Sequence, residues 1–343
     1  METGLLLYRL FAGVGFYNQL FSLETALYLA LISQRKLLVH MQNPLSHCGR
    51  VNWKYGNVTH YLHSEDLQNI TFSHKNPSPE WTRYFSKSVK LEYSTPRFSG
   101  RVFVDADQRD HPHLSSFRHG RQQTDFPLSL LDPNIPVIYV SGSNASRCFY
   151  NFFTSSQNYH LMNIMAQKLC CLHPLLETIS QDIIDKIRYQ NDSYVAIHCR
   201  FGDRRKPVTG INAYNQHIET RLRAWLEHYH KDVKKPFIVM MVDRQDNKLA
   251  KCLQKDYPVS LTHDFITPEI KKKLSTVYSQ TDVAEFLIQK RICEESDYFI
   301  GNVSSTVSVH IQYSRYLRGK GHTLYGSGHY FNLPNAKLHH LEY

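Results

Sequence analysis

The feature of this sequence that most constrains its fold is an alternation of short apolar runs with segments of helical periodicity. Residues 5–11 form an apolar run of strand length, residues 18–31 carry apolar side chains at helical spacing, and residues 37–40 form a second apolar run. Apolar strands joined by helices are typical of a parallel sheet with both faces covered. The sequence therefore predicts an α/β protein.

The same alternation returns in the second half of the chain and predicts a second sheet. Strand-length apolar runs lie at residues 194–198, 237–242 and 298–300, and helical spacing is found at 215–230, 248–254, 282–293 and 304–315. The length of 343 residues also fits about two domains. We expect an N-terminal domain over residues 1–160, a helical bridge over 161–190 and a C-terminal domain over 191–343. Both domains are expected to be doubly wound, with a cleft between them.

Residues 45–135 show a weaker pattern than the rest of the chain. Pro and His are frequent there, and the one clear strand-length run is residues 102–104, before another at residues 135–140. We interpret the region as loops and insertions on the first domain.

Charge and hydropathy narrow the class of protein. Forty Lys and Arg against thirty Asp and Glu leave a formal net charge of +10, which suits an anionic ligand such as a nucleotide phosphate. No stretch is long and apolar enough for a transmembrane span. Basic and aromatic residues are not interleaved on a recognisable nucleic-acid module, so we expect no nucleic-acid partner.

The cysteines and the sequons leave the compartment open. The seven cysteines cannot all pair within one chain, and the adjacent Cys170 and Cys171 have no second pair at zinc-ligand spacing. Five N-x-S/T triplets suit a secreted protein, but the opening residues lack the features of a signal peptide. We expect a cytoplasmic protein if the chain is complete, and one of the secretory pathway (ER or Golgi lumen) if a leader has been removed.

Three loops follow predicted strands, which is where open α/β sheets bind their ligands, and the first of them is rich in glycine. Gly13 and Gly15 let the backbone approach a ligand closely, and the helix that begins near Asn18 offers unpaired N–H groups. The same residues also fit a tight turn with an N-cap at Asn18. This loop alone therefore leaves ligand binding and a structural role open.

The second loop carries the strongest candidates for phosphate binding. His198 and Arg200 come directly after an apolar strand and lie two residues apart, so on an extended segment they point toward the same face. An arginine can hold a phosphate with two parallel, charge-assisted hydrogen bonds. Asp203 and the two arginines after it allow an alternative, a surface ion cluster.

The third loop places three consecutive hydroxyl groups where a helix begins. Ser304, Ser305 and Thr306 follow the apolar run at residues 298–300. Such residues are good helix caps, and they also bind phosphate beside the positive end of the helix dipole. Capping alone would need only one of them, so phosphate binding is the favoured interpretation.

Taken in order, the three loops resemble the GDP-fucose protein O-fucosyltransferase family and its relatives. The chain has a Gly-rich loop that ends in Asn-Gln at residues 18–19, H-x-R-x-G-D at 198–203, and F-I-G-N-x-S-S-T at 299–306. The resemblance covers both ends of the fold and hardly touches residues 45–160. Phe16 and Tyr17 differ from the smaller residues usual before Asn-Gln in that family.

This resemblance implies a GT-B fold of two facing Rossmann-like domains and the inverting, metal-independent transfer of fucose from GDP-fucose to a hydroxyl group. The acceptor would be a protein or an oligosaccharide, the C-terminal domain would bind most of the nucleotide, and no cofactor would be needed. By position, Arg200 would grip the diphosphate and His198 would hold the nucleotide or its ribose. The remaining carried-over residues are Asp282 near guanine or ribose, Asn18 near the fucose, and Ser304, Ser305 and Thr306 at the phosphate or nucleotide.

Two carboxylates are candidates for the general base that accepts the proton of the acceptor hydroxyl. Glu24 falls on the apolar side of the predicted helix, where burial would raise its pKa toward useful basicity, but it also fits an ordinary ion pair. Asp203 is the second candidate, and the neighbouring arginines favour a structural role for it.

Three alternatives remain. Two of them keep the fold with a different activity, and the third is a metal-dependent glycosyltransferase. The enzyme could use another sugar nucleotide or a glycan acceptor, as an α1,2-type fucosyltransferase does, or the protein could bind a sugar nucleotide or glycan without catalysis. Asp105 and Asp107 form a D-x-D pair like that of metal-dependent glycosyltransferases, with His111 and His113 nearby. Such a pair is expected by chance in a chain of this composition, so we predict no metal site.

Overall fold

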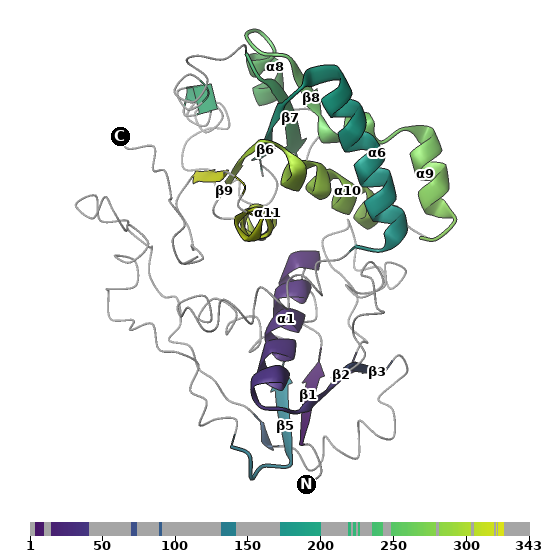
Figure 1. Cartoon of the computed structure of the whole chain (residues 1–343), viewed down its shortest axis with the longest axis vertical. Helices are drawn as coiled ribbons and strands as arrows, with labels where there is room; N and C mark the ends of the chain where they lie inside the picture. The colour runs from purple at the N-terminus through teal and green to yellow at the C-terminus, as the bar shows by residue number, and fades with distance from the viewer. Residues whose placement is uncertain are drawn as a thin grey trace, which may run out of the picture. The chain divides into compact units, whose positions relative to one another are not determined.

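The computed structural model describes residues 4–9, 15–40, 70–73, 89–90, 132–141, 172–199, 219–220, 222–223, 226, 235–242, 248–278, 281–302, 305–318, 320 and 322–325. The chain divides into two compact units, Met1–Pro174 with Phe331–Asn335, and Leu175–Tyr330 with Ala336–Tyr343. Each unit contains one sheet (Figure 1).

The first unit contains a parallel sheet of five strands. These are β1 (Leu5–Arg9), β2 (Lys36–His40), β3 (Ile70–Ser73), β4 (Val89–Lys90) and β5 (Val137–Ser141). The order is β3-β2-β1-β5-β4, and every pair is parallel. The runs at the start of the chain and at 135–140 are thus confirmed as strands.

The expectation of a single strand between residues 45 and 135 is wrong. Both β3 and β4 fall in this range and form the two edges of the first sheet, while residues 102–104 lie outside the described residues. An edge strand pairs on one side only and can be very short, and β4 has just two residues. Strands of that length carry no periodicity that a sequence can reveal.

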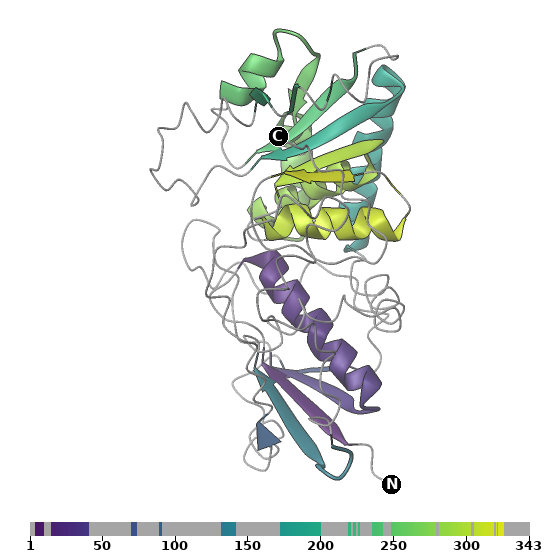
Figure 2. The same cartoon turned by 90° about the vertical axis from the view of Figure 1, so that its left-hand side faces the viewer.

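Helix α1 (Phe16–Ile32) crosses one face of the first sheet and is buried on almost all sides (Figure 2). Fourteen of its 17 residues are buried, although the sequence predicts only an apolar stripe. Its buried polar groups include Ser22, whose hydroxyl lies 2.6 Å from the Tyr8 hydroxyl, and Thr25, which donates to the Phe21 carbonyl at 2.9 Å. Leu31, expected on the apolar side, is half exposed.

The second unit contains another parallel sheet of five strands. These are β6 (Tyr194–Cys199), β7 (Phe237–Val242), β8 (Val259–Leu261), β9 (Tyr298–Asn302) and β10 (His322–Tyr325), in the order β10-β9-β6-β7-β8. Successive strands extend the sheet from β6 to one side and then return to its other side at β9. The strand order therefore reverses between β6 and β9, and this switch point is where such sheets bind ligands.

Helices cover both faces of the second sheet, as the doubly wound prediction requires. The helices are α6 (Pro174–Asn191), α8 (Lys248–Leu253), α9 (Pro268–Ser275), α10 (Asp282–Glu295) and α11 (Thr306–Leu317), with a short 3-10 helix at Thr262–Phe265. Leu249 and Leu253 of α8 pack with Ile197 on one face. On the opposite face the Tyr194 hydroxyl donates to the Ile292 carbonyl of α10.

Three elements of the second unit were not expected from the sequence, namely β8, β10 and α9. Both β8 and β10 are short edge strands. Helix α9 does have a start signal, because Thr267 is its N-cap and accepts from the Ile270 N–H, and Pro268 takes the first helical position. The sequence Thr267-Pro268 therefore marks the start of α9.

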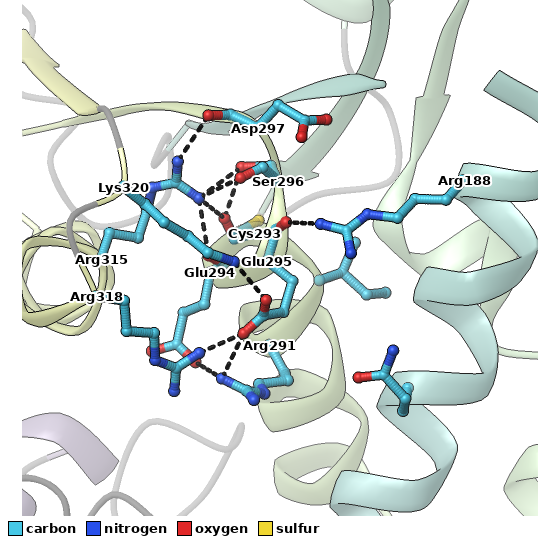
Figure 3. Close-up of polar contacts among 12 residues, drawn as sticks. Arg188, Arg291, Cys293, Glu294, Glu295, Ser296, Asp297, Arg315, Arg318 and Lys320 are labelled. Atoms are coloured by element: carbon cyan, nitrogen blue, oxygen red, sulfur yellow. Dashed lines mark hydrogen bonds and ion pairs between the residues drawn. The ribbon is translucent and has the colours of Figure 1, made fainter. Parts of the chain in front are cut away.

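A cluster of charged residues joins the C-terminal ends of α10 and α11, on the side of this sheet where its strands begin (Figure 3). We call it the amino-edge cluster, and it consists of Lys290, Arg291, Glu294, Glu295, Arg315, Arg318 and Lys320. Glu295 accepts from Arg291 at 2.9 Å and also contacts Arg318 and Lys320. The cluster therefore ties the end of α10 to the chain that leaves α11.

The buried carboxylate of this cluster should make the second unit sensitive to acid. Burial raises the pKa of the Glu294 carboxyl, but attraction to Lys290 and Arg291, with smaller contributions from Arg318 and His310, outweighs burial and lowers it to about 2. A carboxyl with a lowered folded pKa stabilises the fold above its unfolded pKa, and that stability is lost as the pH falls toward the folded value. We expect unfolding free energy to fall by about 3 kcal/mol between about pH 5 and pH 2 from this group alone.

Urea unfolding at several pH values checks this expectation. Glu294→Gln should be less stable at neutral pH and should lose this part of the acid dependence. Glu177→Gln is the matched control, because Glu177 also contacts Arg291, at 3.1 Å, but lies at a more exposed position. An identical acid dependence in Glu294→Gln and the unmodified protein would contradict the assignment.

Candidate functional site

The switch point of the second sheet brings together two buried polar side chains from distant parts of the sequence. His198 is the last residue but one of β6 and is 4% exposed. Its Nδ1 lies 2.6 Å from the hydroxyl of Ser308, a fully buried residue in the first turn of α11. The strand residue that the sequence singled out is thus held in place by the helix that follows β9.

A glycine on β9 allows this close approach of the helix. Gly301 pairs with His198 in the sheet register, so the two residues lie side by side on adjacent strands. A β-carbon at position 301 would lie 2.8 Å from the Ser308 β-carbon and 2.7 Å from the Phe299 ring. Both distances are shorter than any ordinary contact, so a larger residue would push α11 away from β6.

The N-terminus of α11 carries a second buried hydroxyl. Ser305 directly precedes the first helical residue, Thr306, and is 1% exposed. Within the described part of the chain, the Ser305 hydroxyl has no hydrogen-bond partner, so it does not cap the helix. Burying an unpaired hydroxyl costs about 1 to 3 kcal/mol, and a ligand at this helix end could supply the missing partner.

The structure describes only one of the remaining candidate site residues of the second unit, Asp282. Asp282 is the first residue of α10, which returns to the amino end of β9 and so begins on the carboxyl side of the sheet, the side where His198 and Ser305 lie. Arg200, Asp203 and Ser304 lie outside the described residues, and their places in the site stay predictions.

In the first unit, the Gly-rich loop leads into the N-terminus of α1 at the carboxyl end of β1. Gly15 is the N-cap, and its carbonyl accepts from the N–H groups of Asn18 at 3.1 Å and Gln19 at 3.2 Å. A glycine cap has no side chain, and the first turn of α1 contains no acidic residue. Asn18 is part-exposed in this turn, whereas Gly13 lies outside the described residues.

Glu24, one of the two candidate bases, lies deep in α1. It is eight residues beyond Phe16, the first helical residue, which corresponds to about 12 Å along the helix axis. The side chain is 1% exposed. This depth in the helix favours a structural role for Glu24 in the core.

Sequence reasoning missed Ser308 and Gly301, although both leave a trace in the sequence. A glycine inside an apolar strand often marks the close approach of another backbone element. Ser308 stands one helical turn after Ser305, so the two hydroxyls share a helix face. What the sequence lacks is the pairing of β9 with β6, which alone brings Ser308 to His198.

Neither a metal centre nor a membrane helix is found in the described parts of the chain. No group of three or more His, Cys, Asp or Glu side chains among these residues is arranged to hold a metal ion. Asp105, Asp107, His111 and His113 lie outside them. None of the described helices is long and apolar enough to span a bilayer.

Comparison with known proteins finds similarity in structure but no match in sequence. No protein-family model and no curated protein matches the sequence. A variant of FUT1 from Arabidopsis thaliana in complex with GDP matches with a TM-score of 0.50 and 11% identity, over 92% of this chain and 68% of that one. POFUT1 in complex with GDP also gives 0.50 and 11%, over 94% of this chain and 99% of that one. The fucosyltransferase NodZ from Bradyrhizobium gives 0.46 and 13%, over 92% and 94%.

The matches to FUT1 and POFUT1 establish the class of fold. FUT1 and POFUT1 are fucosyltransferases, and the likeness covers nearly the whole of this chain. The chain has an α/β fold of the GT-B class, with two parallel sheets, as the sequence predicts. At 11% identity the likeness concerns the fold alone.

Proposed function

We propose that this protein is a glycosyltransferase that moves fucose from GDP-fucose to a hydroxyl group of a protein or glycan acceptor, with inversion and without a metal ion. The observation that carries the proposal is the buried, unpaired Ser305 hydroxyl at the N-terminus of α11, beside the buried pair of His198 and Ser308. A helix N-terminus attracts phosphate because its N–H groups and dipole both favour negative charge.

The class of fold supports GDP as the nucleotide. FUT1 and POFUT1 were both solved in complex with GDP, and they share the GT-B fold with this chain. The motifs that resemble the O-fucosyltransferase family contribute further support, because one of them begins at His198 and another ends at Ser305 and Thr306. We therefore assign nucleotide binding to the C-terminal domain and the acceptor side to the N-terminal domain.

In the proposed reaction, negative charge develops on the β-phosphate as the bond between fucose C1 and the phosphate oxygen breaks. Arg200 and the N-terminus of α11 would stabilise this charge more in the transition state than in the ground state. Ser304, Ser305 and Thr306 would donate to the phosphates from the same helix end. The departing GDP keeps the electron pair of the broken bond.

Other residues of the proposed site orient the two substrates. Asp282 would accept hydrogen bonds from the ribose or the guanine, and His198 would contact the nucleotide or its ribose. Asn18 and the glycine backbone at Gly13 and Gly15 would approach the fucose. The acceptor hydroxyl attacks C1 from the face opposite GDP and must give up its proton. We favour Asp203 over Glu24 as the base, since Glu24 lies deep in the core of the first unit.

Nucleotide selectivity tests this proposal directly. In the presence of a chelator, GDP at about a hundred times its Kd should stabilise the fold by about 2.7 kcal/mol and raise the Tm by roughly 5 to 10 °C. UDP and CMP should have much smaller effects. GDP-fucose should then be consumed with an acceptor from a panel of folded protein domains and oligosaccharides.

The outcomes separate the proposal from its alternatives. No response to any nucleotide would overturn it, and a preference for UDP would point to another donor. Binding of GDP without turnover on any acceptor would favour a non-catalytic protein. Activity that requires Mn²⁺ and disappears in Asp105→Ala would replace the metal-independent mechanism with a metal-dependent one.

A further inference from the structure

We propose that Ser308 is a positioning residue, which fixes the imidazole of His198 so that it meets the diphosphate or ribose of a nucleoside diphosphate. This inference rests on the proposed function for its ligand, but the contact itself is a property of the protein. It assigns a role to a residue outside the three motifs that the sequence analysis identified.

The contact between these residues is short and well shielded. The distance from His198 Nδ1 to the Ser308 hydroxyl is 2.6 Å, and both side chains are at least nine-tenths buried. An imidazole turns about only two side-chain bonds, so one hydrogen bond from a fixed neighbour leaves it little rotational freedom. Fixing Nδ1 therefore also fixes the direction in which Nε2 points.

The partner is itself fixed by the packing of α11 on the sheet. Ser308 lies against Gly301, where even a methyl group would come within 2.8 Å of its β-carbon. Gly301 is the register partner of His198, so the helix, the glycine and the histidine form one contact across β9 and β6. The hydroxyl of Ser308 can reach the ring only because position 301 carries no side chain.

The position of this pair in the fold distinguishes it from an ordinary satisfied core histidine. His198 lies at the carboxyl end of β6, beside the point where the strand order reverses. Sheets of this kind bind their ligands at the carboxyl ends of the strands at that point. Ser305, whose hydroxyl is unpaired in the described structure, lies three residues before Ser308 and so on the same face of α11. The same helix face thus carries a hydroxyl for the ligand and the hydroxyl that orients the histidine.

The chemistry of the partner also suits a residue that contacts a nucleotide. A serine hydroxyl is neutral and can donate or accept, so it orients the ring without adding a negative charge beside the phosphates. A carboxylate in its place would repel the diphosphate. The arrangement therefore combines a fixed ring with a site that remains favourable to anions.

Ser308→Ala tests this role in the full chain, with two measurements. Loss of one hydrogen bond to a fixed ring should raise the Kd for GDP about tenfold. The ¹⁵N signals of the His198 ring, assigned by comparison with His198→Ala, should shift or broaden because Nδ1 loses its partner. The alanine fits the same space, so the free energy of unfolding should fall by no more than the loss of one buried hydrogen bond, about 1 to 3 kcal/mol.

Ser314→Ala is the matched control, because Ser314 is a second buried serine of α11 and lies nearly two turns further along the helix. It should leave both the Kd and the ring signals unchanged. Unchanged ring signals in Ser308→Ala, or an equal loss of affinity in Ser314→Ala, would overturn the positioning role. If the unmodified protein fails to bind GDP, the proposed function fails, while the ring signals still decide whether Ser308 orients His198.

Discussion

Replacing Arg315 with methionine is expected to lower the free energy of unfolding by about 3 to 5 kcal/mol, because it removes a donor that several buried groups share. The fully buried guanidinium donates to the carbonyls of Glu294 at 2.7 Å, Ser296 at 2.6 Å and Asp297 at 3.1 Å. It also donates to the Ser296 hydroxyl at 3.1 Å and approaches the Cys293 carbonyl at 3.4 Å (Figure 3). Methionine has a similar length and no donor.

The charge of Arg315 matters as well as its hydrogen bonds. Burial lowers the pKa of its guanidinium to about 10, so it stays charged at neutral pH. The carbonyls that surround it belong to the C-terminal end of α10, which is the negative end of the helix dipole. The helix end thus stabilises a cation, and an apolar residue at position 315 loses both the charge and the hydrogen bonds to these carbonyls.

Thermal and urea unfolding measure the effect of the substitution. A loss of 3 to 5 kcal/mol corresponds to a fall in Tm of about 10 °C. Arg318→Met is the control, because Arg318 belongs to the same cluster but is 37% exposed and pairs with Glu295, so it should cost about 1 kcal/mol or less. If the two variants were equally stable, the carbonyls around Arg315 would not be the source of its contribution.

Arg200→Ala should abolish most of the transfer activity under the proposed function. An arginine that forms two hydrogen bonds to a phosphate oxygen as charge develops on it contributes a few kcal/mol, or about two to three powers of ten in rate. The fall should appear in kcat more than in the affinity for GDP-fucose, because the additional charge on the β-phosphate develops only as the bond to fucose breaks. The Tm should not change, since Arg200 follows β6 in the sequence and the sheet already holds that strand.

Two neighbouring substitutions sharpen this test. Arg200→Lys keeps the charge and loses the planar pair of donors, so it should recover only part of the rate. Arg204→Ala removes a charge from the same loop and should retain most of the activity if the alternative, a surface ion cluster, applies to that residue. Near-normal turnover in Arg200→Ala would remove Arg200 from the reaction.

Much of the fold could be predicted because buried parallel strands read as continuous apolar runs. The run at 237–242 became β7 with the same bounds, and those at 194–198 and 298–300 each extended by one or two residues. The strands that escaped prediction are β3, β4, β8 and β10, all short and none at the centre of a sheet. Their pairing depends on a neighbouring strand, which local sequence does not encode.

The sequence predicts which chemical groups belong to the candidate site, but it does not predict which of them are in contact. Strand ends, hydroxyls and a helix start identified His198 and Ser305 without any structure. The contact between His198 and Ser308 spans 110 residues of sequence, so only the order of the strands can reveal it. For Glu24, the spacing of apolar residues predicts a place on an apolar face of the helix. That spacing cannot show that α1 is buried on nearly all sides.

Helix α11 carries both the end that is proposed to bind the ligand and the residue Arg315. The folding of this unit and its binding of ligand are therefore linked equilibria. A ligand that binds only the folded unit adds RT ln(1 + [L]/Kd) to its stability, about 2.7 kcal/mol at a hundred times Kd. That gain is close to the loss expected from Arg315→Met. In a living cell, where small changes in stability alter protein abundance several-fold, the level of a weakened variant would follow the supply of sugar nucleotide as well as its own sequence.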